Sequence, residues 1–217
     1  MLFKGNIIMS EKKQNAVSNH NGVENNIGST CFMDIETSGL PITGGFNKYY
    51  PFNQTAYYDE SRIIELAYNI TDSRGNVVLS HSVLIKPDGF TIENSHIHGI
   101  KHEDAERDGV AIKEALLKFN EDLKRFNCDK LVCHNINFDK TIMLSESWRN
   151  DVNDLTQNIL RLSGICTMDM GKKIMKVRKC PKLVELYHYL FKETVIQNHR
   201  ALDDVKLCMK CYFEMVV

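Results

Sequence analysis

Several features that would assign this sequence to a special class of protein are missing. No stretch approaches the ~20 consecutive apolar residues of a membrane-spanning helix, and polar residues follow Met1–Lys4, so we expect no secretory leader and no membrane partner. The seven cysteines lack a framework spacing, which favours reduced thiols and a cytoplasmic, intracellular location. Cys208 and Cys211 resemble a redox or zinc pair, but no second pair matches them, and core packing is the favoured interpretation.

An excess of charge of either sign is also missing. The formal net charge is -1, so no global positive field gathers nucleic acid around the chain. Any contact with nucleic acid must therefore be local or run through bound metal. The strongest basic stretch, Gly171–Lys182, holds six Lys or Arg residues. Such a run is usually a solvated surface, but in a near-neutral chain it is a candidate for phosphate contacts.

The length of 217 residues suits one domain with a full core. Residues 1–28 are rich in Asn, Ser, Lys and Gln without periodicity, which predicts a disordered N-terminal tail; Met9 is an alternative start. Residues 29–217 form the expected folded domain.

The stretch Thr30–Leu40 is the one around which the rest of the chain is organised. Apolar residues lead into Asp34 and Glu36, and side chains alternate along a strand, so the two carboxylates point one way and Met33 and Ile35 the other, into a core. Adjacent carboxylates at the end of a buried strand repel each other and resist desolvation, which favours Mg²⁺ or Mn²⁺ beside them. An isolated Asp-x-Glu usually marks a solvated strand end, so the interpretation depends on other carboxylates completing the site.

The apolar pattern predicts an α/β fold. Strands are expected over residues 30–36, 62–71, 77–86, 131–134 and 164–168, the first three as an antiparallel meander and the fourth parallel to the first. Helices are expected over 110–126, from the segment after Asn135 through Trp148, and over 183–191 and 201–215, with short helices and turns over 92–108.

The connection 41–59 is unusually long and holds six aromatic residues. It is either an aromatic flap beside the carboxylates, able to stack on bases, or an insertion that folds back and buries its own rings. The sequence leaves both interpretations open.

Three separated segments resemble the motifs of the DEDDh 3′–5′ exonucleases, the family of the bacterial proofreading subunit, RNase T and oligoribonuclease. The segments are Asp34-Ile35-Glu36-Thr37-Ser38-Gly39-Leu40, His134-Asn135-Ile136-Asn137-Phe138-Asp139 and His199-Arg200-Ala201-Leu202-Asp203-Asp204. The resemblance covers roughly residues 30–215. It implies an RNase H-like fold, with a mixed five-stranded sheet flanked by helices, and makes 29–217 an exonuclease domain. The connection after Leu40 is longer than in compact members.

The resemblance also implies the roles of the site residues. Asp34, Glu36, Asp139 and Asp204 would hold two ions of Mg²⁺ or Mn²⁺, and His199 would be the general base that deprotonates the attacking water. Residues expected to bind the substrate or shape its cleft are Thr37, Gly39, Leu40, His134, Asn135 and Phe138. Without the resemblance, Asp139 would be interpreted as an ordinary acid in the first turn of a helix. Asp203, which is not the motif acid, is interpreted in that way.

The expected activity is metal-dependent hydrolysis of phosphodiester bonds from the 3′ end of single-stranded nucleic acid, releasing nucleoside monophosphates. Two cations can stabilise both the attacking and the leaving oxygen, and a histidine suits proton transfer near neutrality. His98-Gly99-Ile100 resembles a turn of the proofreading branch and tilts the expectation toward DNA, with short RNA as the alternative. The alternative to an enzyme is a non-catalytic module that binds nucleic acid or docks on a polymerase. A polymerase partner is possible, and the oligomeric state stays open.

Overall fold

The computed structural model describes residues 28–195 and 200–216, so residues 1–27 of the expected tail lie outside the described part. The strands are β1 (Ser29–Thr37), β2 (Ile63–Thr71), β3 (Val77–Leu84), β4 (Cys128–Cys133) and β5 (Ser163–Cys166). The helices are η1 (Thr55–Tyr58), α1 (Ser95–His98), α2 (His102–Asp108), α3 (Ile112–Arg125), α4 (Ile136–Arg149), α5 (Asn153–Arg161), α6 (Thr167–Ile174), α7 (Leu183–Phe191) and α8 (Ala201–Val216).

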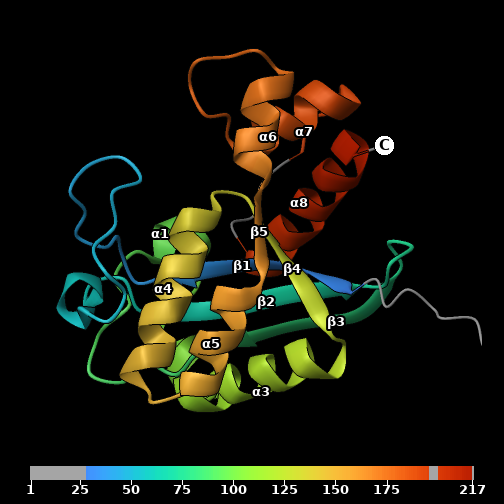
Figure 1. Cartoon of the computed structure of the whole chain (residues 1–217). Helices are drawn as coiled ribbons and strands as arrows, with labels where there is room; N and C mark the ends of the chain where they lie inside the picture. The colour runs from blue at the N-terminus through green and yellow to red at the C-terminus, as the bar shows by residue number, and fades with distance from the viewer. Residues whose placement is uncertain (1–27, 196–199, 217) are drawn as a thin grey trace, which may run out of the picture.

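One mixed sheet runs through the middle of the molecule (Figure 1) in the order β3-β2-β1-β4-β5. β1 pairs antiparallel with β2, and β2 with β3. β4 runs parallel to β1, and β5 runs parallel to β4. The expected α/β, RNase H-like sheet, a meander joined to parallel strands and flanked by helices, is therefore confirmed.

β1 is the central strand, and its two faces pack against different helices. Cys31, Met33 and Ile35 join a core with residues of α3, α4 and α5. Phe32, between the first two, joins a second core under α7 and α8. Asp34 alternates with Met33 and Ile35, so the expected division of the strand into a core face and a carboxylate face is confirmed.

Two helices on either side of β5 were not predicted from the sequence. α5 occupies 153–161, for which no element was expected, and α6 begins at Thr167, inside the expected strand 164–168. β5 has only four residues, and Asp169 lies in the first turn of α6, where the helix dipole favours an acid. A short apolar run does not by itself distinguish a strand end from a helix start, which explains the wrong boundary.

Much of the long connection 41–59 folds back on the protein. Tyr58 is only 1% exposed, and its hydroxyl donates to the Tyr50 carbonyl oxygen. The rings of Tyr50 and Tyr57 stack with centroids 3.8 Å apart. The interpretation as an insertion that buries its own rings therefore holds for Tyr58, whereas Tyr50 and Tyr57 are only partly covered and Phe46 is 76% exposed.

Cys208 and Cys211 are buried on α8 in the second core, and all seven thiols are free, in agreement with a packing role for this pair. Among the helices in the described part of the chain, none has the length and apolar character to cross a membrane.

Candidate active site

Three carboxylates from two elements meet where β1 passes beneath the start of α8. Asp34 and Glu36 extend from β1, and Asp204 from the first turn of α8. One carboxylate oxygen from each lies within 4.8 Å of the others. The structure therefore brings together acids 170 positions apart in the sequence, as the motif spacing predicts.

Asp139 brings a fourth carboxylate from another direction. It lies in the first turn of α4, which follows β4, and its side chain is nearly inaccessible, the residue being 3% exposed. After burial, its charge is the next cause that raises the pKa of Asp34, and the charge of Asp204 adds to the effect of burial on its own pKa. The backbone N–H groups of Asp139 and Ile35 oppose the rise in its pKa. Asp139 therefore interacts electrostatically with these acids, although it is not one of the three whose oxygens lie within 4.8 Å of one another.

Burial and mutual repulsion make the ionised forms of these acids costly. Burial, followed by the charges of Asp139, Asp204 and Glu36, raises the pKa of Asp34 well above its usual range. Burial and nearby carboxylates raise the pKa of Glu36 to about 8, and the positive charge of Arg200 opposes that rise. Burial raises the pKa of Asp139 to about 8. The site is therefore arranged for a positive charge between its acids.

The donor set fits hard divalent cations. All four groups offer carboxylate oxygens, the ligands that Mg²⁺ and Mn²⁺ prefer over the nitrogen and sulfur ligands favoured by zinc. Asp34 and Glu36 are only partly covered, whereas Asp139 and Asp204 form a buried wall. A cation at this position would offset both the burial and the repulsion that raise the pKa values of the acids.

An ion pair that the sequence analysis missed, between the buried acid Glu65 and the half-exposed Arg200, holds the start of α8. Glu65 lies opposite Glu36 on β2 and is 1% exposed. Its carboxylate accepts from Arg200 Nη2 at 2.7 Å and from the Ala201 backbone N–H at 3.0 Å. This carboxylate fixes the first turn of α8 and hence Asp204. The only sign of this pair in the sequence is that Glu65 is the single acid in the apolar run Ile63–Thr71.

His199, the expected general base, lies outside the described residues, so its role remains a prediction. Its neighbour in the motif, Asp203, has a half-exposed side chain that pairs with Lys206 at 3.3 Å. This surface ion pair agrees with the interpretation of Asp203 as an ordinary first-turn acid.

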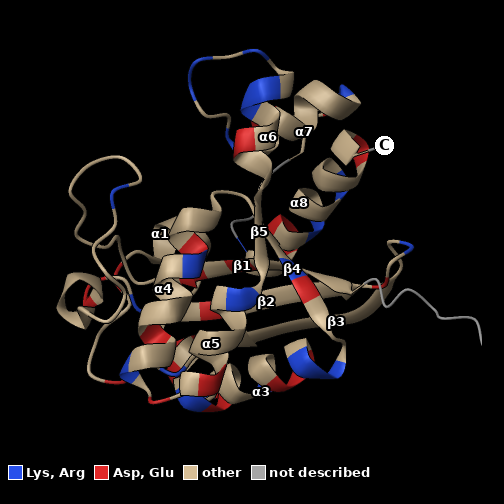
Figure 2. Ribbon diagram, in the orientation of Figure 1, with Lys and Arg blue, Asp and Glu red and all other residues tan. Residues whose placement is uncertain are grey.

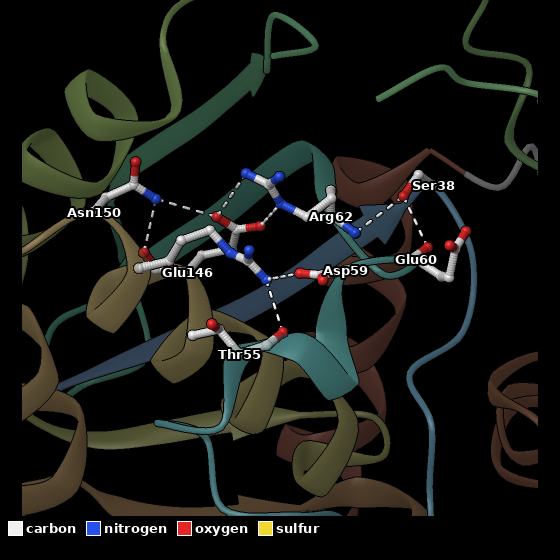
Figure 3. Close-up of polar contacts among 8 residues, drawn as sticks. Ser38, Thr55, Asp59, Glu60, Arg62, Glu146 and Asn150 are labelled. Carbon is white, nitrogen blue, oxygen red and sulfur yellow. Dashed lines mark hydrogen bonds and ion pairs between the residues drawn. The ribbon is translucent and has the colours of Figure 1, made fainter. Parts of the chain in front are cut away.

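The segment after Glu36 is fixed to the start of β2 (Figure 3). The Ser38 hydroxyl accepts from the Arg62 backbone N–H at 3.0 Å and donates to the Glu60 carbonyl oxygen at 2.9 Å. Gly39 approaches that carbonyl so closely that a Cβ would lie 2.7 Å from its oxygen, so only glycine fits. Leu40 follows and is 77% exposed, free to contact a ligand.

Thr37 and His134 make internal hydrogen bonds. The Thr37 hydroxyl donates to the Gly39 carbonyl oxygen at 2.8 Å, which shapes the turn that presents Leu40. His134 Nε2 lies 3.1 Å from the Pro181 carbonyl oxygen and Nδ1 lies 3.0 Å from Thr167 Oγ1. Because a carbonyl only accepts, Nε2 carries the hydrogen, and burial lowers the pKa of this imidazole to about 4. His134 therefore stays neutral and links β4 to the segment before α7.

Asn135 and Phe138 lie at the start of α4. Asn135 has left-handed backbone geometry, with φ of 78°, and its buried Oδ1 makes no hydrogen bond within the described structure. Phe138 packs against the main core. Tyr49, from the long connection, interacts with Asn135 and Asp139: burial and the charge of Asp139 raise the pKa of its phenol, and the Asn135 side chain opposes that rise. The sequence singled out the connection but not this residue.

The raised pKa values imply a pH dependence of the metal-free protein. Glu36 and Asp139 titrate near pH 8 when folded and near pH 4 when unfolded. Between these values the folded state binds more protons, so the free energy of unfolding falls as pH rises. In EDTA we expect the melting temperature to drop by roughly 5 °C or more between pH 5 and pH 8. Calorimetry of the wild type and Glu36→Gln measures this, and the variant should show a shallower drop. A wild-type profile that rises over this range would contradict the expectation.

Comparison with known proteins agrees with this geometry. The family model RNase_T, described as exonuclease, matches residues 31–212 and so spans all three motifs. No protein with a curated description matches the chain.

Several solved structures share the fold. The complex of E. coli exonuclease I with a dA16 oligonucleotide aligns with a TM-score of 0.65 and 19% identity over 87% of this chain. The zinc-bound complex of the same enzyme with single-stranded DNA aligns with a TM-score of 0.63 and 20% identity over 87% of this chain. Each alignment covers 40% of the exonuclease I chain, so this chain spans well under half of that enzyme. Exonuclease X bound to 5′-overhanging duplex DNA aligns with a TM-score of 0.55 and 20% identity over 86% of this chain and 90% of its own.

Proposed function

This chain belongs to the RNase T exonuclease family, and from that membership we propose that it is a DEDDh-type 3′–5′ exonuclease acting on single-stranded DNA. The observation that carries the proposal is the meeting of Asp34, Glu36 and Asp204, with Asp139 in the same electrostatic cluster. A merely structural surface would not concentrate repelling carboxylates at the end of a central strand.

Each group has a definite part in the proposed reaction. Asp34, Glu36, Asp139 and Asp204 would hold two divalent cations, Mg²⁺ or Mn²⁺. When bound, such ions activate a water and neutralise charge on the phosphodiester and its leaving oxygen. Glu65 and Arg200 keep the Asp204 carboxylate in place. His199 accepts the proton of the attacking water, a role that rests on the third motif and on the ordinary pKa of imidazole.

The segment at the end of β1 positions the terminal nucleotide. Gly39 lets the chain pass against the Glu60 carbonyl, and Leu40 presents an exposed apolar side chain to a base. Single-stranded and duplex DNA are the ligands of the similar solved exonucleases, which supports DNA over the alternative of short RNA.

Digestion of end-labelled oligonucleotides tests the proposal. A dT20 strand labelled at its 5′ end should give a ladder of gradually shortened products in Mg²⁺. The same strand labelled at its 3′ end should give labelled mononucleotide from the first turnover. Matched RNA should be shortened more slowly. Mononucleotide released first from a 5′ label would overturn the direction, faster digestion of RNA would favour the alternative substrate, and binding without shortening would favour a non-catalytic module.

The proposed metal site predicts stabilisation by divalent ions. Ligand at 100 times its dissociation constant stabilises a protein by about 2.7 kcal/mol, which raises the melting temperature of a domain this size by roughly 5–10 °C. We expect this rise with millimolar Mg²⁺ or Mn²⁺ and expect Asp204→Asn to remove most of it. Asp203→Asn, which changes the adjacent exposed acid, is the matched control and should keep the rise. Equal shifts in the two variants would contradict the metal assignment.

A further inference from the structure

A strongly basic lobe lies apart from the carboxylate cluster, on α6, α7 and the segment between them. Between Thr167 and Lys192 the chain has seven Lys or Arg residues and two acids, although the full chain has a net charge of -1. In Figure 2 these basic residues appear in blue on α6 and on the loop that leads to α7. Lys176, Arg178 and Lys179 are all exposed.

Most of these charges take no part in the ion pairs of the described structure. Ion pairs in the described structure involve basic residues elsewhere, such as Arg62, Arg149 and Arg200. In that described part, no ion pair involves any basic residue of Gly171–Lys182, and Glu185 accepts instead from the Lys182 backbone N–H at 2.8 Å. The stretch Gly171–Lys182 therefore carries positive charge without an acidic partner in the part of the chain that the structure describes.

An apolar groove lies beside these charges. It has a volume of about 530 Å³ and is lined by Met175, Val177, Lys179, Pro181, Tyr189 and Lys192, among others. Tyr189 is 40% exposed, and the Lys192 ammonium lies 4.8 Å from its ring centroid. Flat apolar surface next to separate cations is the combination that binds single strands, with bases stacked and phosphates paired to Lys or Arg.

The groove is connected to the active site through one hydrogen bond. Pro181, which lines it, accepts from Nε2 of the neutral His134 at 3.1 Å. His134 directly follows β4, and Asp139 lies five residues further, in the first turn of α4. We therefore expect a strand with its 3′ end at the carboxylates to extend its 5′ side toward this lobe.

We propose that the lobe formed by Lys176, Arg178, Lys179 and the Tyr189 groove binds the phosphodiester backbone of single-stranded DNA on the 5′ side of the bond being hydrolysed. The proposal rests on the proposed exonuclease function and adds a second contact region for its substrate. It predicts that long strands bind more tightly than short ones, and that this difference in affinity decreases as the salt concentration rises.

The test compares two triple variants. Lys176→Gln/Arg178→Gln/Lys179→Gln removes three charges from the lobe, and Lys113→Gln/Arg125→Gln/Arg161→Gln removes three exposed charges from α3 and α5, at the opposite end of the molecule in Figure 1. Binding is measured by fluorescence anisotropy of labelled dT20 with phosphorothioate 3′ linkages, in Mg²⁺, from 50 to 200 mM salt. In parallel, catalysis is measured with the p-nitrophenyl ester of thymidine 5′-monophosphate. This small substrate occupies only the position of the reacting nucleotide and does not extend to the lobe.

The lobe variant should bind dT20 about 10-fold more weakly at 50 mM salt, with a salt slope smaller by about 2, since each phosphate contact on a single strand contributes about 0.7. Its ester hydrolysis and the binding by the control variant should match wild type. Equal dT20 binding by the lobe variant and wild type would overturn the proposal. If the ester is not hydrolysed even by wild type, the exonuclease function fails, while anisotropy still decides whether the lobe binds the strand.

Discussion

Replacing Asp34 with asparagine is expected to lower the rate of oligonucleotide shortening on the order of 1000-fold or more and at the same time to raise the stability of the metal-free protein. Asp34 interacts with every other acid of the cluster: burial raises its pKa most, and the charges of Asp139, Asp204, Glu36 and Glu65 raise it further. An amide of the same shape removes that repulsion but supplies a weaker, neutral ligand. Functional sites commonly impose such a cost on stability, of about 0.5–2 kcal/mol.

The two effects are measured on the same preparation. Initial rates on 5′-labelled dT20 give the loss of activity, and melting in EDTA at pH 8 should give a rise of a few degrees. Asp203→Asn is again the matched control and should change neither quantity noticeably. An active Asp34→Asn protein would remove Asp34 from the metal site. An inactive but destabilised one would show that the loss came from misfolding.

The expectations that held depended on local chemistry and simple periodicity. Alternation along β1 placed Met33 and Ile35 in the core and set Asp34 apart from them, because a strand presents its side chains alternately whatever surrounds it. The helix at 183–191 was found at its exact bounds because its apolar face repeats with helical spacing. The carboxylate cluster could be anticipated because three motifs, each short and local, carry its members.

Features that depend on contacts between distant segments were not predictable in this way. Glu65 and Arg200 are 135 positions apart, and only the pairing of β1 with β2 beneath α8 brings the acid to the start of that helix. Whether the aromatic connection 41–59 folds back could not be predicted either, because the stacking of Tyr50 on Tyr57 depends on the path of the loop in the folded protein. Periodicity indicates which face is apolar, whereas the partner of a buried charge is set by the tertiary fold.

A buried ion pair beside the turn that follows β1 gives the other large expected effect. Arg62 and Glu146 have side chains that are 14% and 3% exposed, and the guanidinium Nε donates to the Glu146 carboxylate (Figure 3). Asn150 also donates to Glu146, at 3.2 Å. Replacing Arg62 with alanine would leave the Glu146 charge buried with a single amide partner. Loss of one member of such a pair costs about 3–5 kcal/mol, so the melting temperature should fall by roughly 10 °C.

The matched control is Arg107→Ala, at an exposed pair with Asp104 and Asp108 whose arginine side chain is 64% exposed. Its loss should cost at most about 1 kcal/mol, since water solvates the acids that remain. The double change Arg62→Met/Glu146→Leu should recover most of the stability lost in Arg62→Ala, because it removes the buried charge together with its partner. Equal losses in Arg62→Ala and Arg107→Ala would contradict this account.

Arg62→Ala should also affect substrate binding, because the same residue holds the turn after β1. The backbone N–H of Arg62 donates to Ser38, and its carbonyl oxygen accepts from the Ser38 N–H at 2.9 Å. Movement of the Arg62 backbone would shift Gly39 and Leu40 while leaving the carboxylates on the rigid part of β1. Below its melting temperature, Arg62→Ala should therefore raise KM for oligonucleotides more than it lowers kcat. A loss confined to kcat would instead place the effect of Arg62 at the metal site, because ground-state contacts to the terminal nucleotide would then be intact.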